Sequence, residues 1–250
     1  ENADAKRGLF ARLEPKLSGE AILATNTSTI PITRLAEKLA KPERFLGIHF
    51  FNPVRKMPLV EVIRGKKTSD ETVATAVAYA KAIGKSPIVV EDGPGFLVNR
   101  LLFPYMNESL ELILEGAAID DVEKAATRFG MPMGPITLFD VVGIDVCIHA
   151  GLVMYEAFPD RMVGGNPLPT ALYKAGRMGQ KTGAGFFSYK DKRGRGTPDP
   201  WTENLIAEKR RSQTKFTREQ LTERMFLPML LEATRVLEEK LVRDPRDVDL

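Results

Sequence analysis

The pattern of predicted elements changes at one point in the chain, near Asp92. Before it, helical patterns alternate with four short apolar runs that are typical of buried strands, over residues 21–24, 45–50, 59–63 and 87–90. After the sequence Gly93-Pro94-Gly95 the apolar residues recur at helical spacing, and no convincing alternating strand follows. The sequence therefore predicts an α/β domain over residues 1–92, followed by an all-α part.

The helical part divides further by composition. Residues 93–190 contain three predicted helices, over about 95–115, 119–129 and 136–158, and then a glycine-rich stretch. The next residues, 191–215, are charged and begin with a Pro- and Gly-rich segment, which is typical of a linker. We therefore expect a helical domain over 93–190 and a linker after it.

Beyond the linker, residues 216–250 repeat part of the first helical domain. Three residues stay in register between the two copies: Arg100, Pro104 and Glu108 align with Arg224, Pro228 and Glu232. A weak repeat of this kind predicts a duplicated helical unit. The second copy stops at Leu250 before it is complete, so we expect only the start of a second repeat.

Charge and cysteine content exclude several classes of function. The 36 Lys and Arg residues against 33 Asp and Glu leave a net charge of +3, and the charges are interspersed, so nucleic acid is not an expected partner. Cys147 is the only cysteine, which excludes an internal disulfide framework and a Cys-rich zinc site and favours a reducing compartment. We expect no bound metal. No apolar run approaches the ~20 residues that cross a bilayer, so no transmembrane segment is expected.

The two histidines are the first candidates for a general base. His49 stands at the exit of a predicted buried strand, where α/β sheets place their ligands, although alone it could simply close the strand through a hydrogen bond. Glu61 lies in the apolar run 59–63, where an ionised side chain needs a partner. If the two strands are neighbours, Glu61 can accept a hydrogen bond from one imidazole nitrogen and leave the other as a base; at a sheet edge it would point into water instead. His149 lies in the middle of a predicted helix and is expected to be a packed or solvated helix residue.

Two further polar groups could reach the same edge of the sheet. The sequence Asn26-Thr27-Ser28-Thr29 ends a predicted strand, although helix N-capping explains Ser or Thr there equally well. Asn99 follows Gly93-Pro94-Gly95 by one helical turn and offers an acceptor and two donors, and helix capping is again the alternative. Neither G-x-G-x-x-G nor G-x-x-x-x-G-K-[ST] occurs, so the chain lacks the usual phosphate-binding loop.

Taken in order, these motifs resemble one enzyme family, the 3-hydroxyacyl-CoA dehydrogenases. The resemblance spans nearly the whole chain and is carried by Asn26-Thr27-Ser28-Thr29, His49-Phe50-Phe51-Asn52-Pro53, Glu61, Gly93-Pro94-Gly95-Phe96-Leu97-Val98-Asn99-Arg100, Gly134-Pro135 with Asp140, and Gly179-Gln180-Lys181-Thr182-Gly183-Ala184-Gly185-Phe186. The duplicated helical unit further resembles the multifunctional β-oxidation enzymes, whose chains also carry an enoyl-CoA hydratase domain ahead of the dehydrogenase.

This resemblance implies a fold and a reaction. The fold would be the later part of a Rossmann-like NAD-binding domain, then a helical dehydrogenase C-terminal domain and a partial second repeat. The reaction would be the NAD-dependent oxidation of (S)-3-hydroxyacyl-CoA to 3-oxoacyl-CoA in fatty-acid β-oxidation. By motif, His49 matches the catalytic base, Glu61 its carboxylate partner and Asn99 a substrate-contacting amide. The residues that match cofactor contacts are Glu1, Lys6, Ser28 and Asn52, and Ser28 also matches a substrate contact.

The family's first βαβ unit, with its glycine fingerprint, would precede Glu1. We therefore expect the isolated chain to bind NAD weakly or not at all and to be inactive. Two other classes are a related β-hydroxyacid or sugar dehydrogenase and a non-catalytic binding or assembly module; a charged residue such as Glu61 in an apolar strand argues against the module. The resemblance implies a thiolase subunit or a second copy of the chain as partner, and a cytoplasmic location in a bacterium or a mitochondrial or peroxisomal one in a eukaryote. The sequence does not indicate the acyl chain length.

Overall fold

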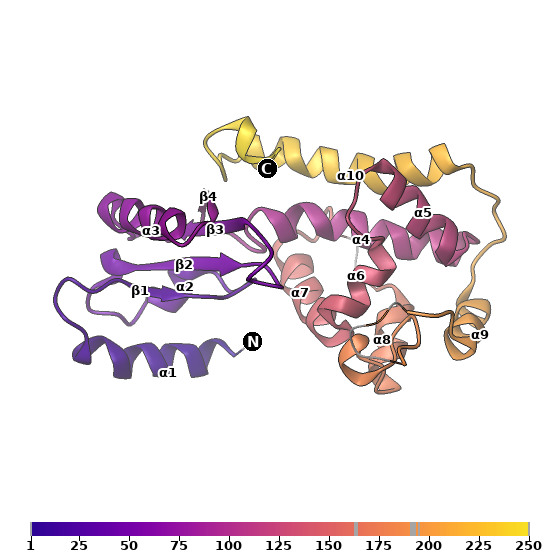
Figure 1. The fold of residues 1–250 in the computed structure, drawn as a ribbon, viewed down its shortest axis with the longest axis horizontal. Coiled ribbons are helices and arrows are strands. Elements are labelled where there is room, and N and C mark those ends of the chain that lie inside the picture. The colour runs from indigo at the N-terminus through magenta and orange to yellow at the C-terminus, as the bar shows by residue number, and fades with distance from the viewer. Residues whose placement is uncertain (1, 163–164, 191–193, 195, 250) are drawn as a thin grey trace. The chain divides into compact units, whose positions relative to one another are not determined.

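The computed structural model describes residues 2–162, 165–190, 194 and 196–249. It divides the chain into two compact units: residues 1–100 with 233–250 form unit 1, and residues 101–232 form unit 2. Among the described residues, the four strands lie in unit 1 and most of the helices lie in unit 2 (Figure 1).

Unit 1 contains a four-stranded sheet in the order β1-β2-β3-β4. The strands are β1 (Leu23–Thr25), β2 (Phe45–Phe50), β3 (Leu59–Arg64) and β4 (Ser86–Glu91). β1 is parallel to β2 and β3 is parallel to β4, whereas β2 and β3 are antiparallel. The four predicted strands are confirmed, and the turn between β2 and β3 makes these two strands neighbours in the sheet.

Helices cover both faces of the sheet in Figure 1, with α1 (Ala3–Leu13) on one side and α3 (Asp70–Ala82) on the other. Because side chains alternate along a strand, every second residue of β2 faces the same helix. Leu46 and Ile48 belong to the cluster that includes Val73 and Ala76 of α3.

The opposite face of β2 carries Phe45, Gly47 and His49. The Phe45 ring packs against Phe10 of α1 at 5.2 Å between ring centroids. Gly47 lies so close to Ile32, in α2 (Ile32–Ala36), that a Cβ at this position would come within 2.7 Å of the isoleucine side chain. Alternation along β2 therefore directs His49 to this face rather than to α3.

Short 3₁₀ helices and one end of each of two long helices complete unit 1. The 3₁₀ helices are η1 (Glu14–Lys16), η2 (Pro42–Arg44) and η4 (Pro245–Asp247).

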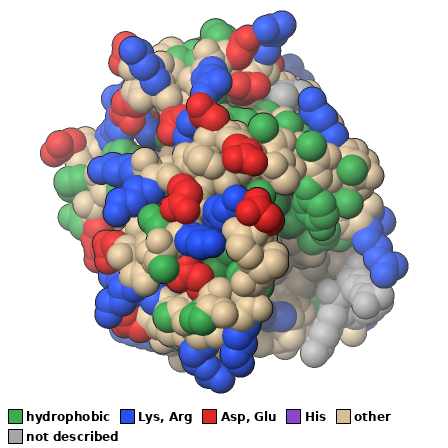
Figure 2. Space-filling model, turned by 90° about the vertical axis from the view of Figure 1, so that its left-hand side faces the viewer, with side chains coloured by type: hydrophobic (Ala, Val, Ile, Leu, Met, Phe, Trp, Pro, Cys, Tyr) green, Lys and Arg blue, Asp and Glu red, His purple; other side chains and the backbone are tan. Residues whose placement is uncertain are grey.

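Over the face in Figure 2, Lys and Arg side chains are interspersed with Asp and Glu side chains and with hydrophobic ones. This face therefore carries mixed charge.

Unit 2 is built of helices around one core. The long helices α4 (Val98–Glu115) and α10 (Arg218–Glu238) each cross the boundary between the two units in sequence. The others are α5 (Ile119–Phe129), α6 (Pro135–Val142), α7 (Ile144–Ala157), α8 (Pro167–Lys174), η3 (Gln180–Thr182) and α9 (Pro200–Lys209). Buried residues of several helices, among them Leu112, Ile136, Leu168 and Met225, form a single cluster.

The single helix predicted over 136–158 was wrong, because the chain forms α6 and α7 with a break at Gly143. Gly143 has φ 103°, a conformation that a continuing right-handed helix does not allow and that glycine adopts without strain. The two helices are bent by 103° at this residue. Among the described residues no single helix is long and apolar enough to span a membrane; α6 and α7 meet that criterion only as a bent pair.

The segment 191–215, predicted to be a linker, contains the helix α9. Asp199 caps it by accepting hydrogen bonds from the N–H groups of Trp201 and Thr202, and Pro200 occupies the first turn. An Asp-Pro pair of this kind is a helix start signal, which the charged composition of the segment concealed. The repeat prediction places a helix after the linker, and α10 with its internal Pro228 lies there.

The glycine-rich stretch is held by Asp140 of α6. The Asp140 carboxylate accepts hydrogen bonds from the N–H groups of Phe186 (2.8 Å) and Phe187 (2.9 Å) and from the Tyr189 hydroxyl (2.9 Å). A Cβ on Gly185 would overlap this carboxylate, at 1.9 Å from Oδ1. Glycine is therefore required at this position by close approach of a side chain.

Candidate active site

His49 and Glu61 meet across β2 and β3, where they are direct register partners. The His49 Nδ1 atom lies 2.6 Å from Glu61 Oε2, and both side chains are buried, with 7% and 0% of the residue exposed. The alternative in which Glu61 points into water from a sheet edge was wrong, because β3 lies between β2 and β4. The sequence predicted this pair only if the two strands were neighbours in the sheet. The structure shows that they are.

The other oxygen of Glu61 is held by the beginning of α4. Glu61 Oε1 accepts hydrogen bonds from the N–H groups of Leu97 (2.9 Å) and Val98 (3.0 Å). A helix N-terminus stabilises a carboxylate through such free N–H groups and through its dipole. Because an ionised carboxylate only accepts, His49 Nδ1 must donate its proton to Oε2, and a neutral imidazole then carries its lone pair on Nε2.

The turn before α4 is shaped to make this contact. Gly95 and Phe96 both have positive φ, 73° and 52°, which is strained for phenylalanine. Successive backbone N–H groups in such a turn converge on one anion. The Phe96 ring is fully buried and lies 5.9 Å from the imidazole centroid, and Phe51 flanks the imidazole at 4.6 Å. Sequence reasoning missed this role of the backbone; the Gly-Pro-Gly-Phe sequence was its signal.

Asn99 and Ser28 come together at the same end of the sheet. Asn99 Nδ2 donates to the Ser28 carbonyl oxygen at 2.9 Å, so this side chain does not act as a helix cap, which would accept from the backbone. Asn26 Oδ1 accepts from the Phe50 N–H at 3.1 Å, which ties the loop after β1 to the residue that follows His49. The Asn99 Oδ1 atom remains as an acceptor beside the half-buried Ser28.

The predicted cofactor contacts are spread over three elements. Asn52 is exposed in the turn after β2, and a cis peptide bond joins it to Pro53. Lys6 is half-buried in α1, and Glu1 lies outside the described residues. His149 is an exposed residue of α7, as the sequence predicted.

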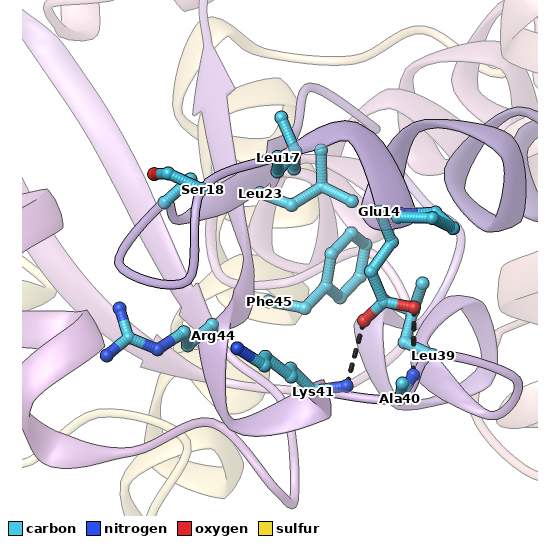
Figure 3. Close-up of a pocket in the computed structure, with 11 residues that line it drawn as sticks. Glu14, Leu17, Ser18, Leu23, Leu39, Ala40, Lys41, Arg44 and Phe45 are labelled. Atoms are coloured by element: carbon cyan, nitrogen blue, oxygen red, sulfur yellow. Dashed lines mark hydrogen bonds between the residues drawn. The ribbon is translucent and has the colours of Figure 1, made fainter.

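Cys147 is not a candidate nucleophile. Burial raises the pKa of its thiol to about 12, so the reactive thiolate form is scarce near neutral pH. A cavity of about 350 Å³ is lined by Leu23 and Phe45, the first residues of β1 and β2 (Figure 3). Glu14 borders it and accepts hydrogen bonds from the N–H groups of Ala40 and Lys41. At about 3.3 Å per residue, His49 lies about 13 Å further along β2, so this cavity is separate from the His49–Glu61 pair.

Two family models match the chain. The model described as 3-hydroxyacyl-CoA dehydrogenase, NAD binding domain, matches residues 1–93, and the C-terminal domain model of the same enzyme matches residues 95–189. At the level of solved structures, the chain is 38% identical to FadB2 of M. tuberculosis, with a TM-score of 0.73, over 76% of this chain and 68% of that one. The chain belongs to the 3-hydroxyacyl-CoA dehydrogenase family. The resemblance predicted from the motifs is thereby confirmed, together with the order of an NAD-binding domain and a helical domain.

Two further solved structures extend the comparison with other 3-hydroxyacyl-CoA dehydrogenases. The (S)-3-hydroxybutyryl-CoA dehydrogenase PaaH1 from Ralstonia eutropha is 38% identical, with a TM-score of 0.71, over 76% of this chain and 68% of that one. The dehydrogenase part of multifunctional enzyme 1 from C. elegans is 32% identical, with a TM-score of 0.65, over 98% of this chain and 56% of that one. The last match includes nearly all of the chain and therefore α10.

NAD is the cofactor of this oxidoreductase family, and the donor set of unit 1 fits the reactive part of a dinucleotide. Three polar groups lie around the ends of β1 and β2: the Ser28 hydroxyl, the Asn99 amide oxygen and the His49 imidazole. These groups can hold a carboxamide or an alcohol through hydrogen bonds. The sequence offers no glycine-rich phosphate loop, so the residues present fit the nicotinamide side of the cofactor rather than its pyrophosphate.

Proposed function

We propose that the protein oxidises (S)-3-hydroxyacyl-CoA to 3-oxoacyl-CoA with NAD⁺, and that His49 is the general base. The observation that carries this proposal is the chain of contacts from the α4 N-terminus through Glu61 to His49 Nδ1, which leaves Nε2 as the acceptor. A base oriented by a buried carboxylate is suited to take a proton from an alcohol.

The proposed step balances in atoms and charge. The 3-hydroxyl proton moves to His49 Nε2 while the C–H bond at C3 breaks and the C3–O bond becomes a carbonyl. The hydride that leaves C3 requires an acceptor, which bound NAD⁺ would supply. The imidazolium that forms is stabilised by the Glu61 carboxylate 2.6 Å away, in a site where burial strengthens the interaction.

Substrate and cofactor positions follow from the polar groups nearby. Ser28 and the Asn99 amide would orient the hydroxyl and the thioester, because hydride transfer requires near-contact geometry. Lys6, Asn52 and Glu1 would contact the cofactor. Phe51 and Phe96 flank the imidazole and limit its contact with water.

The multifunctional β-oxidation context is part of the proposal. It is supported by the match of nearly the whole chain to the dehydrogenase part of multifunctional enzyme 1 from C. elegans, and by the repeat that begins in α10. A thiolase subunit or a second copy of the chain would be the partner in such an assembly.

A substrate screen tests this function on the protein at its natural length. NADH formation is followed with (S)- and (R)-3-hydroxyacyl-CoA, free 3-hydroxy acids and sugar acids. We expect turnover of the (S)-acyl-CoA alone. Turnover of free acids without turnover of acyl-CoA would assign the protein to another dehydrogenase class, and NAD binding without any turnover would leave a binding or assembly module.

A further inference from the structure

The two repeats exchange equivalent ion pairs. Arg100 and Arg224 are 124 residues apart, and Glu115 and Glu239 are separated by the same 124 residues. Within unit 2, Arg224 of the second repeat binds Glu115 of the first at 2.9 Å. Within unit 1, Arg100 of the first repeat binds Glu239 of the second at 2.7 Å. Each repeat therefore supplies an arginine to the glutamate of the other, as the two copies do in a symmetric dimer.

The turns that follow the two long helices are equivalent as well. Gly116 after α4 and Lys240 after α10 both have positive φ, 123° and 57°. The next residue in each turn donates back into its helix, from the Ala117 N–H to Leu112 and from the Leu241 N–H to Val236. The 124-residue shift thus relates the backbone hydrogen bonds of the turns in addition to the ion pairs.

Each turn also binds the segment that precedes the other long helix. In unit 2, the Thr214 N–H donates to the Glu115 carbonyl oxygen at 2.9 Å. In unit 1, the Glu91 N–H donates to the Leu241 carbonyl oxygen at 2.8 Å, and Leu241 is buried beside Gly93. The end of α10 and the turn after it therefore contact both ends of the segment 91–100, through Glu91 at one end and Arg100 at the other.

The two supported segments differ in what they carry. The segment 91–100 contains Leu97 and Val98, whose N–H groups hold Glu61, and Asn99, which holds Ser28. The segment 211–214 holds none of the site residues. Arg100 is also the more buried arginine, with 3% of its side chain exposed against 39% for Arg224.

We propose that Glu239, in the second repeat, is a positioning residue for the His49–Glu61 pair and acts through Arg100. Arg100 lies one helical turn from Leu97, so its guanidinium fixes the first turn of α4 relative to Glu239. A buried guanidinium that loses a carboxylate partner moves toward other partners or solvent. The N–H groups on Glu61 would then loosen, and His49 Nδ1 would lose its fixed acceptor. The consequence for catalysis rests on the proposed function.

The first test observes the imidazole directly, without any assay of turnover. With two histidines in the chain, ¹⁵N-histidine labelling gives separate signals for His49 and His149. We expect the His49 signals of the unchanged chain to show the proton on Nδ1, and Glu239→Ala to shift them toward a mixture of tautomers. Glu115→Ala removes the equivalent glutamate from Arg224 and is the matched control, with no expected change at His49. Equal shifts in both variants, or none in Glu239→Ala, would overturn the proposal.

The second test measures kinetics on the protein at its natural length. Glu239→Ala should lower kcat about 5- to 50-fold with little change in KM for NAD, because misplacement of a catalytic group acts on the chemical step. Glu239→Asp should recover most of the loss, and Glu115→Ala should keep kcat. An unchanged kcat in Glu239→Ala would refute the inference. A third outcome separates the two proposals. If Glu239→Ala shifts the His49 tautomer but the unchanged protein never oxidises acyl-CoA, the proposed function would be refuted and the positioning role would remain.

Discussion

Glu61 in unit 1 and Asp140 in unit 2 are buried carboxylates with nearly the same set of partners. Each accepts two backbone N–H groups from consecutive residues, Leu97 and Val98 for Glu61 and Phe186 and Phe187 for Asp140. In each case the two donors follow a glycine-containing turn. Each carboxylate also has one side-chain donor, a histidine in unit 1 and a tyrosine in unit 2.

The side-chain donors to the two carboxylates differ in the chemistry that they allow. When His49 donates from Nδ1, it keeps on Nε2 an acceptor that can take up a second proton. The hydroxyl is the only polar group of the Tyr189 side chain, so tyrosine has no separate nitrogen that could take up a proton. Burial, with Asp140 beside it, raises the pKa of this hydroxyl. In the proposed function, this arrangement of hydrogen-bond donors around a carboxylate supports proton transfer in unit 1. In unit 2 the same arrangement holds a glycine-rich stretch.

Removal of the histidine should have the largest effect. In the protein at its natural length, His49→Gln should lower kcat by roughly 10²–10⁴ with a smaller change in KM, because a base acts mainly in the transition state. His149→Gln, at an exposed position on α7, is the control and should keep full activity. A His49→Gln enzyme with kcat within twofold of the unchanged protein would remove His49 from the reaction.

Neutralising each carboxylate tests the comparison directly. Glu61→Gln should lower kcat by roughly 10²–10³, since the amide keeps the shape of the side chain but loses the charge that stabilises the imidazolium. Asp140→Asn, the matched change in unit 2, should leave kcat per folded molecule unchanged. Steady-state kinetics on both variants, corrected for the folded fraction, measures the difference; near-full activity of Glu61→Gln would show that Glu61 is structural like Asp140.

Asn99 should have a smaller, kinetic effect. Asn99→Ala should reduce kcat/KM for the acyl-CoA by a factor that corresponds to about 1.5–3 kcal/mol of lost transition-state stabilisation, which is typical of a lost hydrogen bond in a buried site. NADH binding should be unchanged. Asn166, which caps α8 by accepting from the Leu168 N–H, is the control. Asn166→Ala should cost about 0.5–2 kcal/mol of folding stability with kinetics intact. If Asn99→Ala behaved like Asn166→Ala, Asn99 would have no role in substrate binding.

The parts of the site that the sequence predicted are those set by one strand or one motif. Buried strands read from their apolar runs gave β2 and β3, and an ionisable residue in an apolar run required that Glu61 have a partner. The register that puts His49 opposite Glu61 depends on the turn between the strands, which no local pattern fixed. The motif resemblance identified Asn99, but its bond to the Ser28 carbonyl oxygen joins residues 71 positions apart.

The parts that could not be predicted depend on backbone groups and on contacts distant in sequence. Every residue except proline has a backbone N–H, so the hydrogen bonds from Leu97 and Val98 to Glu61 could not be recognised from residue types. The only sequence signal was the preceding Gly95-Phe96 turn. Asp140 belonged to a family motif, yet its partners are 46 to 49 residues away. The break at Gly143 was concealed because glycine occurs inside apolar helical patterns as well as between them.

The smallest expected effect is the pH dependence that Asp140 confers on stability. Burial raises the pKa of Asp140 to about 6, against 3.8 for the unperturbed carboxyl group. A carboxyl with a raised pKa in the folded state binds its proton more tightly there than in the unfolded chain, so the free energy of unfolding falls as the pH rises from about 4 to 6 and is flat above this range. The size of this contribution is on the order of 3 kcal/mol. Asp140→Asn removes the titration, so urea unfolding of both proteins between pH 3.5 and about 7 isolates it as a difference. A difference that stays constant with pH would show that the three hydrogen bonds to Asp140 offset its burial, so that folding leaves the pKa of Asp140 unchanged.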